Sequence, residues 1–226
     1  EALKIEQDLC DKYPENIGYR LDLINTYKYL GDNSFNVDVN PFYQKQFDIA
    51  QRLYEKFPDH LDVKYVYSIA VERRGNILRN SGDDVGAMGL FQEYLALQEE
   101  LLTVDSEVSK YMNGLAIAYS RIGKLYENRG KFAKAHSFFS RERLLLEKLH
   151  DMHPRRMKYW NNLAWCYRYI AGGYISQRKF EEAIEMVELC NIERKKIKGV
   201  SDSPFNYLQK YNHDFETMGY IYRRKG

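Results

Sequence analysis

The sequence contains little cysteine and little proline, three and five residues respectively among 226. The cysteines, Cys10, Cys166 and Cys190, are odd in number and widely spaced, and no CxxC pair occurs. This pattern excludes a disulfide framework and favours reduced thiols in a reducing compartment. We therefore expect a cytoplasmic protein. The chain begins with Glu1 and shows no signal peptide, so we expect it to be a fragment of a longer protein.

Long hydrophobic runs and an excess of one charge are also missing. No apolar run approaches the roughly 18 residues that a membrane-spanning helix needs. The 34 Lys and Arg residues nearly balance the 32 Asp and Glu residues, which leaves a net charge of +2. This balance does not point to a polyanionic partner. We therefore expect neither a membrane nor a nucleic acid as partner, while an apolar content of 44% is sufficient to build a core.

The sequence signatures of catalysis and of metal binding are absent too. There is no HExxH, GxGxxG, GxxxxGKS/T or GxSxG motif, and no cysteine pair stands at zinc spacing. His150 and His153 are spaced so that one helix face could present both as metal ligands. We favour a simpler interpretation, a polar helix end before Pro154. We predict that the chain is not an enzyme and that it uses no cofactor and no metal.

What the sequence does contain is an internal repeat. When the chain is shifted against itself by 48 residues, Gly75 falls on Gly123, then on Ala171 and then on Gly219. An earlier copy aligns at an offset of 44, at which Gly31 falls on Gly75. Other positions that follow the 48-residue shift are Leu78, Tyr126, Tyr174 and Tyr222, and also Ala87, Ala135 and Ala183.

The residues within one copy resemble the tetratricopeptide repeat (TPR), whose pattern runs from an aromatic residue through leucine, glycine, tyrosine, alanine and phenylalanine to proline. The third copy carries nearly all of it: Tyr119, Ile122, Gly123, Tyr126, Gly130, Ala135, Phe139 and, displaced, Pro154. The second copy departs at Val71 and Arg74, and the fourth has Ala171 and Arg178 where glycine is expected. The TPR period is 34, so the 48-residue period implies about two extra turns on each of two helices.

The resemblance implies an all-α fold, a right-handed α-solenoid of stacked antiparallel helix hairpins with about ten helices in total. We expect a single array over 1–226, with repeats at 17–60, 61–106, 107–154 and 155–202 and partial repeats at 1–16 and 203–226. Because both ends fall within a repeat, they also favour a fragment of a longer chain.

Two closely spaced glycines in the third copy have different expected roles. We expect Gly130 to end the first helix in a left-handed conformation, which satisfies the last carbonyl groups. We expect Gly123 to lie inside that helix where the second helix crosses it, because the missing side chain lets Ala135 and Phe139 approach. Close packing then offsets the cost of about 1 kcal/mol that glycine carries in a helix interior.

The remaining signals for helix starts and loops are consistent with helix hairpins. Asn40 with Pro41, and Ser203 with Pro204, are typical of an N-cap followed by a first helical residue. The segment 32–40 is the one connection long enough for a role of its own, and we interpret it as a loop.

In TPR-like arrays the first helix of each hairpin lines a concave surface, so first-helix positions off the packing stripe are the candidate binding residues. They combine aliphatic or aromatic residues with arginines and asparagines, which suits an extended peptide: amides pair with its backbone, and guanidinium groups take carboxylates. The alternative is an ordinary solvated helix face whose apolar residues pack on the next repeat. The candidates are Tyr65, Ile69, Arg73, Asn76, Asn80, Asn113, Ile117, Arg121, Lys124, Asn128, Asn161, Trp165, Arg168 and Tyr169.

Some members of the family clamp a C-terminal carboxylate with lysine and asparagine on one first helix and lysine and arginine on the next. The matching positions here are Ser120 and Lys124, followed by Trp165 and Tyr169. They do not reproduce that set, so we do not predict a receptor of this kind.

We predict a non-catalytic protein–protein interaction scaffold that binds a protein or peptide partner along this surface. The alternative is a sensor or regulatory repeat portion of a larger multidomain signalling enzyme. A helical-repeat RNA-binding protein is disfavoured because it would need a basic groove, and the net charge is only +2. The sequence does not define the oligomeric state.

Overall fold

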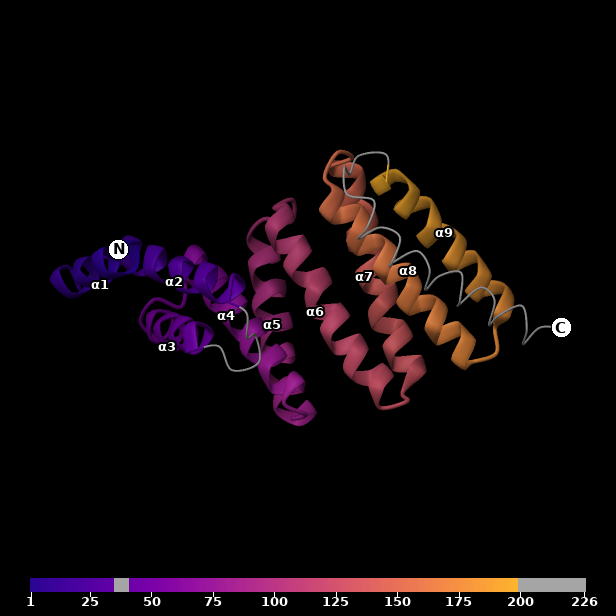
Figure 1. The fold of residues 1–226 in the computed structure, drawn as a ribbon, viewed down its shortest axis with the longest axis horizontal. Helices are drawn as coiled ribbons and strands as arrows, with labels where there is room; N and C mark the ends of the chain where they lie inside the picture. The colour runs from indigo at the N-terminus through magenta and orange to yellow at the C-terminus, as the bar shows by residue number, and fades with distance from the viewer. Residues whose placement is uncertain (35–40, 199–226) are drawn as a thin grey trace. The chain divides into compact units, whose positions relative to one another are not determined.

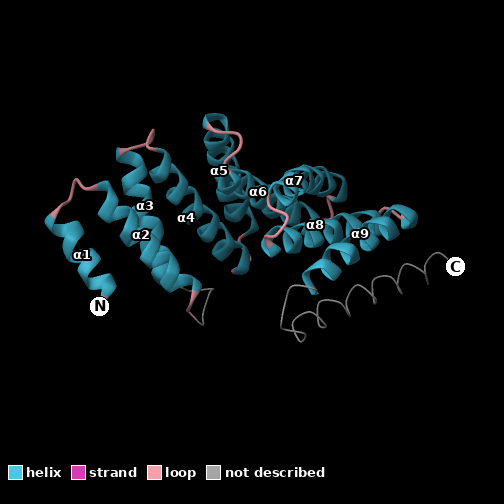
Figure 2. Cartoon of the chain, turned by 90° about the horizontal axis from the view of Figure 1, so that it is seen from above, coloured by secondary structure: helices cyan, strands magenta, loops and turns pink. Residues whose placement is uncertain are grey.

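The computed structural model of the chain describes residues 1–34 and 41–198. Within these ranges it contains nine helices and no strand (Figures 1 and 2), which confirms the all-α prediction. The helices are α1 (Ala2–Lys12), α2 (Ile17–Asp32), α3 (Pro41–Lys56), α4 (Leu61–Asn80), α5 (Asp84–Val104), α6 (Ser109–Asn128), α7 (Phe132–Met152), α8 (Met157–Ser176) and α9 (Phe180–Lys198). Predictions for Asn40, Ser203 with Pro204 and the partial repeat 203–226 lie outside the described residues.

The chain forms two compact units, Glu1–Tyr111 and a second that begins at Met112. In the first unit each helix packs on the next, from α1 through α5. In the second unit α7 packs on α8 and α8 packs on α9. Neighbouring helices run antiparallel within each unit (Figure 1). Both units are therefore built from stacked helix hairpins, as the repeat predicts.

The helices begin at regular positions along the chain. The first helices of three successive hairpins begin at residues 61, 109 and 157, and their second helices begin at 84, 132 and 180. The first helices have 20 residues each, and the second helices have 21, 21 and 19. These lengths agree with the two extra turns per helix that the spacing of the repeat implies. The boundaries drawn between repeats remain a prediction.

The turns between the two helices of a hairpin use left-handed residues. Gly130 has φ +67°, and the following amide, that of Lys131, donates to the carbonyl of Tyr126 at 2.9 Å. This confirms the prediction that Gly130 ends its helix. Gly82 has φ +88° in the preceding hairpin. In the last described hairpin Arg178 adopts the left-handed conformation at this turn, with φ +59°.

Arg178 is therefore a strained residue that glycine should relieve. We expect Arg178→Gly to raise the stability of the second unit by about 0.5–1 kcal/mol, because a side chain disfavours the left-handed region while glycine adds some freedom to the unfolded chain. Urea unfolding followed by tryptophan fluorescence measures this. The neighbouring Gln177 has φ −92°, so Gln177→Gly should destabilise instead. A loss of stability in Arg178→Gly would contradict the strain.

The contact between the two helices of a hairpin is closed by a glycine and a ring. A Cβ added at Gly123 would lie 2.6 Å from Cε1 of Phe139, and one added at Gly75 would lie 2.6 Å from Cε1 of Phe91. The ring of Tyr43 covers Gly31 in the same way. This confirms that the second helix crosses the first at the recurring small residue.

The hairpin of α8 and α9 carries a different pair at this contact. Ala171 stands where the other hairpins have glycine, and the position that corresponds to Phe139 is Val187. Both residues are buried. The smaller partner side chain leaves room for the methyl group, so the departure from the TPR pattern is compensated within the hairpin.

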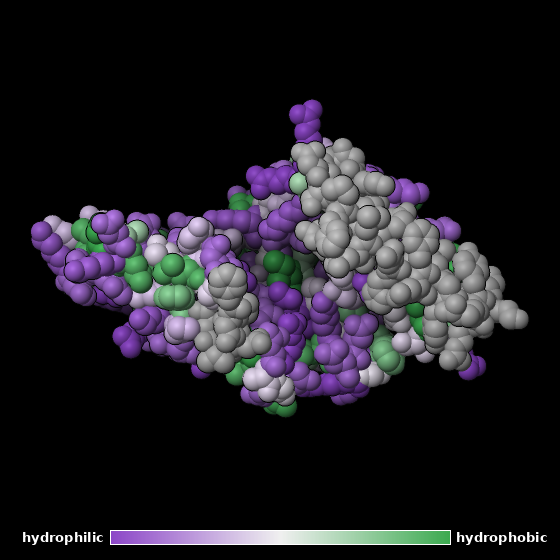
Figure 3. All heavy atoms as spheres, viewed as in Figure 1, coloured by the Kyte–Doolittle hydropathy of each residue, from purple (hydrophilic) through white to green (hydrophobic). Residues whose placement is uncertain are grey.

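On the face seen in Figure 3, the described residues that are visible are predominantly hydrophilic, and the hydrophobic ones form small separate groups. Among the residues that the structure describes, no helix is long and apolar enough to cross a membrane.

Candidate partner-binding site

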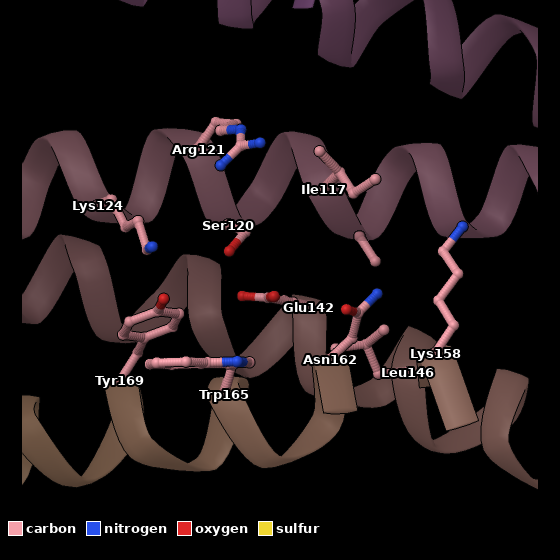
Figure 4. A pocket seen from close by; sticks show the side chains of 11 residues that line it. Ile117, Ser120, Arg121, Lys124, Glu142, Leu146, Lys158, Asn162, Trp165 and Tyr169 are labelled. Atoms are coloured by element: carbon pink, nitrogen blue, oxygen red, sulfur yellow. The ribbon is translucent and has the colours of Figure 1, made fainter. Parts of the chain in front are cut away.

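The second unit contains a pocket of about 270 Å³ between α6, α7 and α8, which we call the α6–α8 pocket. Figure 4 shows its walls: side chains of α6 face side chains of α8, and two residues of α7 lie between them. The lining residues are Ala116, Ile117, Ser120, Arg121, Lys124, Glu142, Leu146, Lys158, Asn162, Trp165 and Tyr169.

Helical spacing brings these residues to the pocket. Ile117, Arg121 and Lys124 are four and three residues apart, so they share one face of α6. The residues of α8 follow the same rule: Lys158, Asn162, Trp165 and Tyr169. Two first helices thus present their faces to one space, as the TPR resemblance implies.

One wall of the α6–α8 pocket is aromatic. The rings of Trp165 and Tyr169 are stacked, with centroids 6.0 Å apart and planes at 25°. Lys124 places its Nζ 4.2 Å from the centroid of the Tyr169 ring, a distance at which an ammonium group is attracted to the ring. The guanidinium groups of Arg168 and Arg194 lie 5.1 and 5.5 Å from the Trp165 ring. Cations of the chain itself therefore already flank these aromatic faces.

The floor of the pocket carries a buried acid, Glu142 of α7. Its side chain lies below Ser120 and above Trp165 (Figure 4), and the residue is only 5% exposed. Burial raises the pKa of Glu142 from 4.5 to about 8, although a hydrogen bond from Ser120 and the charge of Lys124 act in the opposite direction. Its Oε2 has no hydrogen-bond partner among the described residues. The group is thus mostly a neutral carboxylic acid at pH 7.

Three cations share the pocket with this acid: Arg121, Lys124 and Lys158, which we call the pocket cations. Lys158 extends from α8 toward α6, while Arg121 and Lys124 belong to α6 (Figure 4). Because Glu142 is mostly neutral at pH 7, the charge of the pocket lining is positive.

The structure brings together five of the residues proposed from the sequence: Ile117, Arg121, Lys124, Trp165 and Tyr169. The other candidates of the second unit do not line the pocket. Asn113 is buried at 7% exposure, Asn128 is exposed, and Asn161 and Arg168 are half-buried.

The candidates of the first unit engage residues of that unit. Arg73 forms an ion pair with Asp32 at 2.8 Å, and Asp32 lies at the end of α2 rather than in the expected loop. Tyr43 donates its hydroxyl hydrogen to the same carboxylate at 2.7 Å. Asn76 donates to the backbone carbonyl of Glu72 at 3.1 Å.

The other three candidates of the first unit differ in exposure. Ile69 is half-buried, while Asn80 is exposed and accepts a hydrogen bond from Arg79 at 3.1 Å. The ring of Tyr65 lies 5.7 Å from that of Tyr111 and 4.6 Å from Nζ of Lys110.

Glu142 was not among the residues predicted from the sequence, although the sequence contains a signal for it. The buried residues of α7 form one stripe, and Glu142 is its acidic member. At the same position of the repeat the neighbouring second helices carry Tyr94 and Cys190. A charged residue at a position that is otherwise apolar or aromatic is the informative kind of exception. The other lining residues that were not proposed are Ala116, Ser120, Leu146, Lys158 and Asn162.

The two histidines that were considered as metal ligands have other contacts. His150 lies 3.3 Å from Oδ1 of Asp151 and 3.5 Å from Oε2 of Glu193, and the ring of His153 packs near that of Tyr159. Within residues 1–34 and 41–198, no group of three or more His, Cys, Asp or Glu side chains is placed to hold a metal ion.

Comparison with known proteins identifies the fold. No protein-family model matches the sequence, and no curated protein matches it. Solved structures do match. BtubC (BKLC) from P. vanneervenii has a TM-score of 0.68 at 14% identity, over 98% of this chain and 79% of that chain. MamA has a TM-score of 0.51 at 16% identity, over 88% of this chain and 90% of that chain.

A third solved structure is that of TTC0263, a thermophilic TPR protein of Thermus thermophilus. Its TM-score is 0.51 at 15% identity, over 95% of this chain and 89% of that chain. These likenesses concern the fold. Together with the helix hairpins and the glycine-to-ring contacts, they confirm that the chain has a TPR-like α-solenoid fold.

Proposed function

We propose that the chain is a non-catalytic protein–protein interaction scaffold that binds an extended segment of a partner protein through the faces of its first helices. The observation that carries this proposal is the α6–α8 pocket, where five residues proposed from the sequence alone line one space. The TPR-like fold supports it by analogy, because such arrays bind other chains on the surface of their first helices.

The chemistry of the pocket suits a peptide. Trp165 and Ile117 offer apolar surface at opposite walls, and Asn162 offers an amide to a peptide backbone. A volume of about 270 Å³ is slightly smaller than the range of about 300–1,000 Å³ that is usual for drug-sized ligand sites. One partner side chain would therefore fill it, while the rest of the segment would continue along α6 or α8.

A random library of displayed dodecapeptides, panned against the purified chain, tests the proposal. We expect selected peptides to bind with micromolar Kd by calorimetry. Trp165→Ala should weaken binding at least about tenfold, since aromatic anchors dominate such interfaces, and Lys158→Ala should weaken it about threefold to tenfold by removing a pocket cation. Lys148→Ala is the matched control, because Lys148 is an exposed lysine of α7 away from the pocket.

The proposal fails if panning yields no specific peptide, or if the pocket variants bind as well as Lys148→Ala does. Salt provides a second criterion, because nucleic-acid binding falls steeply between 50 and 200 mM salt. A peptide anchored in the pocket by apolar contacts should lose only a few-fold in affinity over the same range. A loss of about 1,000-fold would favour a polyanion instead.

A further inference from the structure

We propose that the α6–α8 pocket takes the carboxylate of an aspartate or glutamate side chain of the partner segment, which the pocket cations attract and to which Glu142 donates a hydrogen bond. This inference rests on the proposed function, because it names the partner residue that fills the pocket. It makes Glu142 the residue that determines specificity there.

The charges of the pocket favour an anion. Lys124 and Arg121 come from α6 and Lys158 from α8, so they approach the space from both of its main walls. A cationic partner side chain would meet these three positive groups. It would also find the aromatic faces already flanked, since Lys124 lies over Tyr169 and Arg168 lies over Trp165. A carboxylate is the partner group that this arrangement complements.

The buried acid supplies the hydrogen that a carboxylate needs. A second ionised carboxylate beside the ligand would repel it, whereas a protonated one can donate. One oxygen of the buried Glu142 side chain, Oε2, has no hydrogen-bond partner among the described residues. A buried polar atom without a hydrogen-bond partner destabilises the fold, and a bound ligand that pairs with it would remove this penalty. A carboxylate bound in the pocket would accept a hydrogen bond that the protonated Glu142 donates.

The groups that face Glu142 and have shifted pKa values do not change their protonation in the same pH range as Glu142. From α6 it is faced by Ser120, Arg121 and Lys124, and from α8 by Cys166 and Tyr169. Burial raises the pKa of the Cys166 thiol well above its ordinary value and raises the pKa of Tyr169 to about 12. Between pH 7 and pH 9, of the groups in this set whose pKa is shifted, Glu142 alone changes its protonation. The pH dependence of ligand binding in this range should therefore reflect the protonation of Glu142.

The affinity of the pocket for a carboxylate should depend on pH through the protonation of Glu142. The binding-competent form is protonated, so affinity is highest below the pKa of about 8 and falls as the pH rises through it. If only the protonated form binds, affinity falls about tenfold from pH 7 to pH 9. The bound anion should in turn raise the pKa of Glu142 further, because ligand and proton bind cooperatively.

The test uses the full chain and two small probes of equal shape, N-acetyl-aspartate amide and N-acetyl-asparagine amide. Their binding is followed by NMR through the indole N–H of Trp165 from pH 6.5 to pH 9.5. We expect saturable binding of the aspartate probe, at least about fivefold tighter than the asparagine probe at pH 7. We expect the tenfold fall at pH 9 in the native chain and a flat profile in Glu142→Gln, whose amide still donates at high pH.

A carboxyl-carbon titration of the native chain keeps the test independent of that variant. The midpoint of Glu142 should rise when the aspartate probe is present. Equal affinity for the two probes, an unchanged midpoint, or the same pH profile in Glu142→Gln would each overturn the inference. Failure of this inference alone would leave library peptides that need Trp165 but lack acidic residues. Failure of the scaffold alone would leave the aspartate probe bound with no peptide recovered.

Discussion

Gly123→Leu should destabilise the second unit by at least about 3 kcal/mol. Even the first carbon of the new side chain would lie 2.6 Å from Cε1 of Phe139, and Phe139 is itself buried at 1% exposure. Neither helix can retreat without opening the hairpin, so the cost of overpacking exceeds the gain in helix propensity. Both tryptophans of the chain, Trp160 and Trp165, lie on α8, so urea unfolding followed by their fluorescence reports this unit.

Ala133→Leu is the matched control for Gly123→Leu, because Ala133 is exposed on α7 of the same hairpin. It adds the same kind of side chain where nothing needs to move, and a change below about 0.5 kcal/mol is expected. Equal losses in the two variants would show that Gly123 is not at a helix crossing.

A double mutant tests whether Gly123 and Phe139 share one contact. The last described hairpin accommodates Ala171 opposite the smaller Val187. Transferring that pair gives Gly123→Ala with Phe139→Val, and each single change should destabilise on its own. The double mutant should be more stable than the sum of the two losses by about 1–2 kcal/mol. Strict additivity would mean that the glycine and the ring do not share one contact.

Glu142→Gln should stabilise the second unit by a few kcal/mol at pH 8. The acid has a pKa of about 8 when folded against 4.5 ordinarily, so folding favours its protonated form. Stability from this group is therefore present below pH 4.5 and is lost as the pH rises to about 8, with a slope that approaches about 1.4 kcal/mol per pH unit. Glutamine is neutral throughout, so the variant should not show this slope.

The measurement is the urea midpoint of native chain and variant at intervals from pH 5 to pH 8.5. Glu188→Gln removes an exposed carboxylate of α9 and should leave the slope as it is in the native chain. If Glu142→Gln loses stability at pH 8, Glu142 is an ionised partner in a favourable network and not a neutral acid.

The fold could be predicted from the sequence because its determinants are local and recur. Gly123 lies inside α6 and Gly130 just after it, and each is required by a different local geometry: a close crossing and a left-handed turn. The repeat then shows which neighbours share the first requirement, and the structure places rings over Gly31 and Gly75 as well. Arg178 shows the limit of the pattern, since the left-handed turn persists without its glycine.

The candidate site could be predicted only in part. First-helix positions follow from helical periodicity, and this was enough to predict that Ile117, Arg121 and Trp165 belong to one surface, which the structure shows to line a pocket. Glu142 was missed because it lies on the second helix, among charged residues that suggest a solvated face. Its burial depends on α6 and α8 closing over it, and a one-dimensional pattern does not contain that contact.

In the first unit, too, the sequence pattern did not reveal the contacts of the predicted residues. Arg73 and Asn76 stand at first-helix positions equivalent to residues of the pocket. The guanidinium of Arg73 instead pairs with Asp32, 41 positions earlier in the chain, in the copy where the period is shorter. Such a partner becomes visible only when the hairpins are packed.

The central claim is that the α6–α8 pocket anchors a partner segment. The measurement that tests it most directly is a crystal structure of the chain bound to a peptide from the library, or an NMR map of the shifts that this peptide causes. We predict one peptide side chain in the pocket, in contact with Ile117 and Trp165, and a carboxylate of the peptide near Glu142. A peptide bound only to the outer faces of α7 and α9, with the pocket unchanged, would contradict the account.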